Sequence, residues 1–310
     1  MDKNTHGKNV VFLFFLIPAI MLIIGYFIFP YPPQFLWTKQ LVYIPLFIGL
    51  ILLGVGYFYK EKKLGSKIKI TGWILFAFYW STQLNTLYYG EDGDLVNAFL
   101  CIAGIYVLFY IAYHEWLTLK GKEKVQCIDW AAGAACIAGL IYFGIERTSL
   151  ARWLIEIVAA QSGWLLNVFA GDAEAHGVNI FYKGSFAVSI IFACTAVQSM
   201  VLFVGMILPL SKVEIKRKFY GLVITIVPIY FLNLIRNAFI AYLLGTKTTS
   251  FFMAHNIIGK GGSLIALIIL LFIVIRIVPE LIDQIICLTD LYKRNGPVEK
   301  FVKKYFWRKK

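Results

Sequence analysis

Charged residues are scarce in this chain, and their scarcity excludes an ordinary soluble fold. Only 15% of the 310 residues are charged and 60% are hydrophobic, whereas soluble domains carry about 25% charged and about half apolar residues. One soluble core cannot hide this excess of apolar surface. The composition therefore predicts a membrane protein.

Metal-binding patterns are also lacking. The five cysteines form no CxxC pair, which argues against a zinc site and against a disulfide framework. Asp172, Glu174 and His176 are better interpreted as a solvated loop than as a metal site. We therefore expect no metal and no cofactor. Four cysteines are interpreted as small apolar packing residues, namely Cys101, Cys127, Cys136 and Cys287.

About eight apolar runs are long enough to cross a membrane, since a spanning helix needs roughly 20 mostly apolar residues. The first run has no small-residue cleavage site after it, so it is interpreted as a span and not as a signal peptide. The sequence predicts an all-α polytopic membrane protein with about eight transmembrane helices, at Val10–Phe29, Leu41–Tyr59, Ile70–Leu87, Leu95–Tyr113, Val125–Phe143, Ser189–Leu208, Phe219–Leu244 and His255–Val278.

A longer segment separates the fifth predicted span from the sixth. Within it, Leu150–Ala170 alternates apolar and polar residues, as a helix lying in the membrane interface does. A polar loop follows. Val178–Tyr182 and Phe186–Ser189 then read as two short strands joined by a turn at Lys183 and Gly184. We expect this helix and hairpin to lie outside the cytoplasm.

Lysine and arginine are concentrated in alternate loops, and cytoplasmic loops carry the excess of these cations. The third-to-fourth loop is acidic instead, with Glu91, Asp92 and Asp94. This pattern predicts a multi-pass protein of the cell membrane with both termini in the cytoplasm. The net charge of +13 then belongs mainly to the inner face, where it attracts anionic lipid, and does not indicate nucleic acid. The cations lie in residues 60–69, 120–124, 212–218 and 293–310.

With this orientation, three reactive side chains approach the outer face at similar depths. Counting 1.5 Å per residue puts Arg236 roughly 12 Å and Cys194 roughly 8 Å below the outer boundary. His255 begins the eighth predicted span at that boundary. Ionisable groups at membrane depth are candidates for function by default.

A thiol, an imidazole and a guanidinium together suit acyl transfer. A neighbouring histidine or cation favours the nucleophilic thiolate of Cys194. His255 can return the proton to a leaving amine, and Arg236 can stabilise an oxyanion or hold a substrate carbonyl. Each also has an ordinary interpretation. Cys194 can be a packing residue, Arg236 can reach the interface with its long side chain, and His255 can be an interfacial histidine.

The local sequences around these residues resemble the motifs of the exosortase/archaeosortase family. Ala193–Ser199, ACTAVQS, resembles the nucleophile motif A-C-[ST]-G-x-x-S. Asn233–Arg236, NLIR, resembles N-x-x-R, and His255–Gly259, HNIIG, resembles H-x-x-x-G. The order and spacing match over residues 150–278. Two departures stand out: Ala196 replaces the usual glycine, and His255 replaces the arginine of archaeosortase A-type members. The chain therefore resembles another branch, and the sorting signal of A-type members does not carry over.

The resemblance implies a membrane-embedded cysteine transpeptidase. Such enzymes cleave exported proteins at a carboxy-terminal signal, made of a short motif, a transmembrane helix and a basic cluster. They pass the new carboxyl end to an acceptor amine, for which a lipid headgroup amine is the candidate. Carried over, Cys194 is the nucleophile, His255 the acid/base and Arg236 the oxyanion or substrate-positioning group. Support is expected from Asn233, Gln198, Ser199 and Lys260, although Lys260 can also snorkel or reach a lipid phosphate.

We expect three regions: a five-helix support at 1–148, a catalytic core with three spans at 149–278 and a basic cytoplasmic tail at 279–310. Two other functions stay open. A transporter or flippase would bind an anionic substrate at Arg236, but it needs polar residues along both halves of the bundle. The inner halves of the last three predicted spans are nearly all apolar. An assembly scaffold would need none of the three reactive residues.

Overall fold

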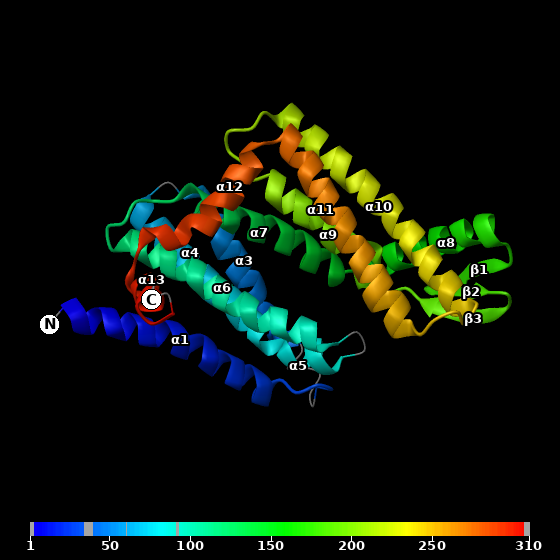
Figure 1. Cartoon of the computed structure of the whole chain (residues 1–310), viewed down its shortest axis with the longest axis horizontal. Helices are drawn as coiled ribbons and strands as arrows, with labels where there is room; N and C mark the ends of the chain where they lie inside the picture. The colour runs from blue at the N-terminus through cyan, green and yellow to red at the C-terminus, as the bar shows by residue number, and fades with distance from the viewer. Residues whose placement is uncertain (1–2, 34–39, 60, 91–92, 307–310) are drawn as a thin grey trace. The chain divides into compact units, whose positions relative to one another are not determined.

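The computed structural model describes residues 3–33, 40–59, 61–90 and 93–306 (Figure 1). It divides into two compact units, Met1–Cys136 with Gln284–Lys310, and Ile137–Asp283. We call them unit 1 and unit 2, and their boundaries fall within α7 and α12. Some residues of the charge pattern lie outside the described ranges, namely Lys60, Glu91, Asp92, Arg308, Lys309 and Lys310.

Unit 1 is helical throughout its described residues. Helix α4 packs extensively against α3 and α6, while the carboxy-terminal α13 packs against α1. A buried ionic cluster joins three helices, because Lys69 of α4 contacts both Glu115 of α6 and Asp129 of α7. The elements are α1 Lys3–Ile28, α3 Tyr43–Phe58, α4 Lys62–Thr82, α5 Leu84–Tyr89, α6 Leu95–Leu119, the first half of α7 Gln126–Glu146, the end of α12 Glu280–Thr289, η3 Asp290–Arg294 and α13 Pro297–Phe306.

Unit 2 combines helices with a small sheet. Helix α10 packs against α8, α9 and α11, and the sheet packs against α8 and α10. In Figure 1, α10 and α11 lie side by side and the strands lie beside one end of α10. After the second half of α7, the elements are α8 Ser149–Ala170, β1 Ala173–His176, β2 Asn179–Tyr182, β3 Ser185–Ser189, η1 Phe192–Thr195, α9 Val197–Ile207, α10 Ile215–Gly245, η2 Phe252–Gly259 and α11 Lys260–Ile277.

The expectation of an all-α polytopic membrane protein is confirmed. Within the described residues, six helices are long and apolar enough to cross a membrane by length and composition, and α3 and α9 are shorter apolar helices. The six include α8, the segment predicted to lie in the interface. The predicted span Ile70–Leu87 is interrupted, since α4 ends at Thr82 and α5 begins at Leu84.

The predicted hairpin is confirmed, with one strand more than expected. Lys183 and Gly184 both have positive φ, 51° and 71°, as a two-residue type I′ turn requires. The stretch expected to be a polar loop contains β1, which pairs antiparallel with β2. Its Glu174 and His176 are exposed and hydrogen-bond each other at 3.0 Å. The sheet order is β1-β2-β3.

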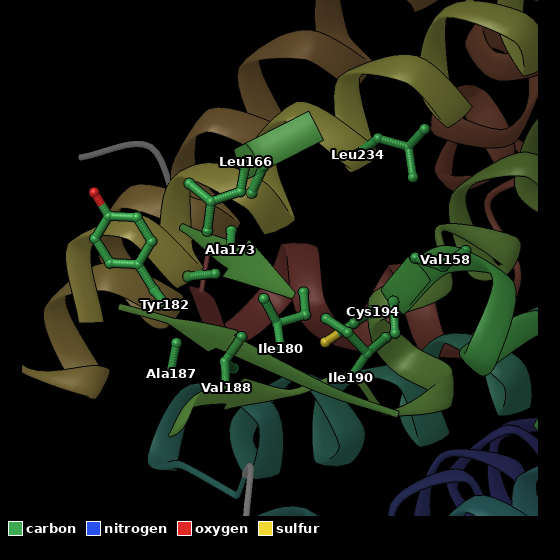
Figure 2. Packing of buried hydrophobic residues seen from close by; sticks show 13 residues of the cluster. Val158, Leu166, Ala173, Ile180, Tyr182, Ala187, Val188, Ile190, Cys194 and Leu234 are labelled. Atoms are coloured by element: carbon green, nitrogen blue, oxygen red, sulfur yellow. The ribbon is translucent and has the colours of Figure 1, made fainter. Parts of the chain in front are cut away.

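One buried cluster in unit 2 connects this sheet to Cys194. It holds Leu166 of α8, Ile180 of β2, Leu234 of α10 and Cys194 (Figure 2). The short sheet thus supplies part of the wall behind the thiol. This arrangement explains why the segment before Cys194 folds as a hairpin whose apolar side chains face α8 and α10.

From Gln284 onward the basic tail is part of unit 1, where Arg294 and Glu299 contact α6. Arg294 donates to the carbonyl of His114 at 2.8 Å and to Thr118 Oγ1 at 3.1 Å. Glu299 is buried, accepts from Tyr113 at 3.0 Å and lies 3.2 Å from His114 Nε2. Burial alone would raise the pKa of the Glu299 carboxyl, but its hydrogen bonds, first of all from His114, hold the pKa below its ordinary value.

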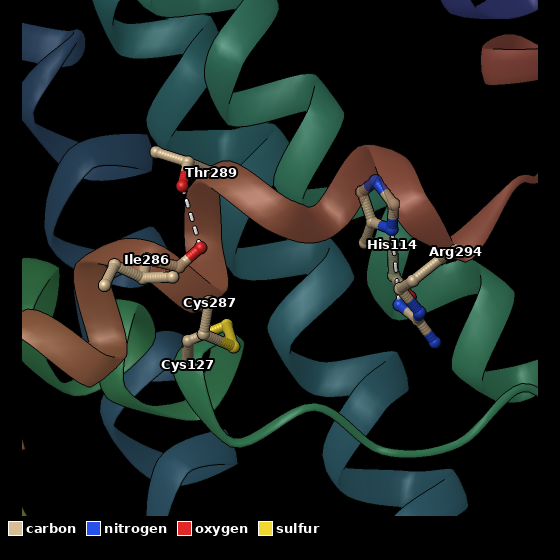
Figure 3. The surroundings of a disulfide bond; sticks show 6 residues. All are labelled: His114, Cys127, Ile286, Cys287, Thr289 and Arg294. Carbon is tan, nitrogen blue, oxygen red and sulfur yellow. Dashed lines mark hydrogen bonds between the residues drawn. A yellow bond between two sulfur atoms is a disulfide. The ribbon is translucent and has the colours of Figure 1, made fainter.

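The interpretation of Cys127 and Cys287 as packing residues is wrong, as is the expectation of no disulfide. These two cysteines form a disulfide that joins α7 to α12 across 160 residues (Figure 3). This bond was not predictable from the cysteine positions, because disulfide partners so far apart in the chain share no spacing pattern. Within unit 1, the bond anchors the carboxy-terminal segment to α7, in addition to the hydrogen bonds that Arg294 makes.

We expect reduction of this disulfide to destabilise the protein. Replacing both cysteines by serine should lower the free energy of unfolding by about 2–5 kcal/mol, because the cross-link restricts the unfolded chain. Thermal unfolding in detergent measures the effect. Reductant should lower the wild-type Tm and leave the double variant unchanged, with Cys136→Ser as a control that keeps the disulfide. Five titratable thiols in the unreduced protein would contradict the bond.

Candidate active site

Cys194 lies in a single 3-10 turn between the sheet and α9. Its side chain is buried, and its Sγ lies 4.0 Å from His255 Nε2. The next turn of chain begins α9 at Val197. The structure thus brings together two of the three predicted reactive residues, from segments 61 residues apart.

The left-handed backbone of Ala196 makes this turn possible. Its φ of 63° and ψ of 2° lie in a region that glycine enters freely and that costs other residues about 1–2 kcal/mol. The nucleophile motif that this segment resembles has glycine at the same position, and the structure gives the physical reason. Ala196 therefore stores strain two residues after the thiol.

Two asparagines on α10 hold the backbone of Cys194. Asn233 Nδ2 donates to the Cys194 carbonyl oxygen at 2.8 Å, and Asn237 Nδ2 donates to the same oxygen at 3.0 Å. Both asparagines are buried. They are one helical turn apart and so share a face. Because a carbonyl oxygen has two lone pairs, these bonds satisfy it fully and fix the peptide plane that follows the nucleophile.

Arg236 lies on the same helix, next to this pair. Its Nη1 lies 3.4 Å from Asn237 Oδ1, so Asn237 connects the guanidinium to the backbone of Cys194. Its Nε is buried and finds no hydrogen-bond partner within the described part of the chain. Gly259 leaves the room for this group, since a Cβ there would lie 3.0 Å from the Nε. A buried donor without a partner favours a ligand oxygen at this position.

His255 is oriented by its neighbours in η2, a π-helix. Its ring stacks on Phe251 at 5.1 Å with an interplanar angle of 8°. Its Nδ1 lies 3.3 Å from Asn256 Oδ1. A proton on Nδ1 would donate to that oxygen and leave Nε2, the atom facing Cys194, as an acceptor. Single π-helical turns occur often at functional sites.

A cavity of about 230 Å³ opens beside these residues, between α9, α10 and α11. Arg236 and Asn233 line it, together with Ser199. Most of the remaining wall is aliphatic. No group of histidine, cysteine and carboxylate side chains with metal-binding geometry occurs among the described residues.

The four residues predicted to support the site differ in how they relate to Cys194 and the cavity. Ser199 lines the cavity and Asn233 holds Cys194, whereas Gln198 is exposed. Lys260 is half-buried at the start of α11. Sequence analysis missed Asn237. The available signal was a second asparagine, four residues after Asn233, on one face of an otherwise apolar span.

These features define a polytopic α-helical membrane protein with a buried cysteine–histidine pair and an arginine-lined cavity. Residues 13–273 match the sequence model of the transmembrane exosortases, and the chain belongs to that family. The family assignment suggested by the three short motifs is therefore confirmed over a much longer stretch than residues 150–278.

Curated relatives agree with this assignment. The chain is 26% identical to archaeosortase A of Haloferax volcanii, an alignment that covers 77% of this chain and 89% of the relative. It is 24% identical to archaeosortase A of Natronomonas pharaonis, with coverage of 83% and 87%. No solved structure matches this fold.

Replacing Ala196 by glycine should stabilise the protein. Glycine adopts the left-handed conformation without strain, which outweighs its greater freedom in the unfolded chain, so we expect a gain of about 1 kcal/mol. Ala160→Gly on the exposed face of α8 is the matched control and should lose up to about 1 kcal/mol. Thermal unfolding of both variants gives the comparison. Equal losses in the two would contradict the strain at Ala196.

Asn237→Leu should disturb Cys194 without unfolding the protein. The substitution keeps the side-chain size, removes one of two hydrogen bonds on the Cys194 carbonyl, and should cost about 0.5–1.5 kcal/mol of stability. The rate of Cys194 alkylation, followed by peptide mass spectrometry, should change severalfold. Thr225→Val, also buried in α10 but bonded only to its own helix, should leave that rate unchanged. An unaltered rate in Asn237→Leu would show that Asn237 does not position the thiol.

Proposed function

We propose that this protein is a protein-sorting cysteine transpeptidase. It cleaves a carboxy-terminal signal of exported proteins through a thioester at Cys194 and passes the new carboxyl end to an acceptor amine. The pairing of Cys194 with His255 beside a cavity that holds the unpartnered Nε of Arg236 carries this proposal. Membership of the transmembrane exosortases and the likeness to two proteins named archaeosortase A support it.

The reaction begins with proton transfer from the Cys194 thiol to His255 Nε2. The thiolate attacks the substrate amide carbon, and negative charge develops on its oxygen. Arg236 stabilises this oxyanion with its guanidinium, whose charge is effective in the apolar surroundings of the site. His255 then gives its proton to the departing amine as the C–N bond breaks, leaving a thioester on Cys194.

An acceptor amine completes the cycle. Its nitrogen attacks the thioester carbonyl, His255 takes a proton from that nitrogen, and the C–S bond breaks. The proton returns to the Cys194 sulfur, so the enzyme is regenerated and a new amide bond is formed. A lipid headgroup amine can serve as acceptor because the site lies in a membrane protein. Water attacking in place of the amine gives hydrolysis.

We infer the orientation from the positions of the charges, and the substrate signal from the resemblance to the exosortase/archaeosortase family. A substrate with a motif just outside its own transmembrane helix presents that motif near the membrane surface, at the depth inferred for Cys194. The lysine-rich loops support cytoplasmic termini and an active site on the outer face. We assign the catalysis to residues 149–278, the support to residues 1–148 and a basic cytoplasmic end to residues 279–310.

Replacing Cys194 by alanine should abolish processing of a co-expressed protein that ends in a sorting helix and basic cluster. The loss should exceed a thousandfold, because the covalent step has no other nucleophile. Gel mobility of the substrate measures it. Cys136→Ala is the matched control and should process normally.

The same assay separates transpeptidation from transport. An anion transporter or flippase would depend on Arg236 and not on Cys194. Normal processing in Cys194→Ala, together with loss of function in Arg236→Ala, would therefore contradict the proposal. Arg236→Lys should restore little, because lysine lacks the planar fork of donors.

A further inference from the structure

The cavity beside Arg236 has a large apolar wall, which the acyl-transfer reaction by itself does not need. Its volume of about 230 Å³ is below the roughly 300–1,000 Å³ of sites for drug-sized ligands. Its deeper wall is apolar, formed by α10 and α11 below the level of Arg236. The residues of this wall are Ile229, Leu232, Ala266, Leu267 and Leu270.

The polar part of the cavity wall adjoins the nucleophile. Asn233 lines the cavity and also donates to the Cys194 carbonyl at 2.8 Å. Arg236 lines it as well, and its buried Nε has no partner in the described ranges. A ligand therefore meets a donor at Arg236, close to Cys194, and hydrocarbon along α10 and α11 on either side of that donor.

We propose that this cavity is a specificity pocket that takes one large apolar side chain of the substrate, next to the scissile bond. The inference rests on the proposed transpeptidase function. Arg236 Nε donates to a backbone carbonyl of the bound peptide, while the adjoining aliphatic or aromatic side chain fills the apolar part of the cavity. The occupant is a side chain and not a lipid tail. The cavity is smaller than the sites that hold drug-sized ligands, and a lipid tail is longer than such a ligand.

Two neighbouring glycines at the start of α11 offer a matched test. A Cβ added at Gly262 would meet no atom within 4 Å, and Gly262 lines the cavity. A Cβ at Gly261 would also meet no atom within 4 Å, but Gly261 is not part of the lining. Replacing either glycine by leucine raises the helix propensity of α11 by the same amount. Only Gly262→Leu fills the pocket.

The experiment uses the full-length protein in vesicles and a reporter library. Each reporter carries an outer domain, a randomised four-residue segment, one apolar helix and a basic end. Sequencing the cleaved products should show a large apolar residue enriched at one position for the wild type. Gly262→Leu should shift that position to alanine or glycine and lower kcat/KM for the large residue roughly tenfold or more. Gly261→Leu should keep the wild-type preference.

Each of the other outcomes contradicts either the proposed function or the proposed pocket. If Cys194→Ala still cleaves the library, the proposed function fails. If Cys194→Ala is inactive but Gly262→Leu keeps the wild-type preference, only the pocket fails. If Gly262→Leu slows transfer to lipid amines while residue preference and thioester formation persist, the cavity serves a lipid and the inference is wrong. Gly262→Ala, with thermal unfolding of all variants, provides a milder substitution should leucine impair folding.

Discussion

Two hydrogen bonds to one backbone oxygen, the carbonyl of Cys194, hold the candidate site together. Asn233 and Asn237 supply both donors from one face of α10. In the hydrocarbon region of a membrane no water can hydrogen-bond to a backbone carbonyl. Leaving such a carbonyl without a hydrogen bond costs several kcal/mol. The pair therefore fixes the single turn of η1 against α10, and with it the direction in which the thiol points. The 4.0 Å approach of Cys194 to His255 depends on that anchorage.

The backbone near Cys194 and His255 is irregular. Within a few residues of Cys194 and His255 the chain passes through a 3-10 turn, a left-handed alanine and a π-helix. Such conformations are tolerated at membrane depth only where protein covers them, and the sheet, α8 and α10 provide that cover for η1. Strained backbone conformations are common at active and ligand-binding sites, where the strain is part of the mechanism.

The sequence allowed the main helices and the hairpin to be predicted, because long apolar runs and a Lys183-Gly184 turn are local signals. It did not predict β1, whose four residues AEAH alternate but include no β-branched or aromatic residue, nor the disulfide, whose partners are 160 residues apart. In the site, the similar depth of the three side chains below the outer boundary, and then the motifs around them, led to Cys194, Arg236 and His255. Asn237 was missed because its role depends on the path of η1 past α10. The strain at Ala196 was likewise invisible, since a dihedral angle is set by the packing of both flanking elements.

The central claim is that Cys194 carries the substrate as a thioester, and mass spectrometry of the acid-quenched enzyme tests it most directly. The protein is incubated with a reporter ending in a sorting helix, without added amine, and digested at low pH. The account predicts an adduct on the peptide that contains Cys194, with the mass of the substrate segment ending at the cleavage point and released by hydroxylamine. Cleaved reporter accumulating with no adduct on Cys194, in an enzyme whose His255 is intact, would contradict it.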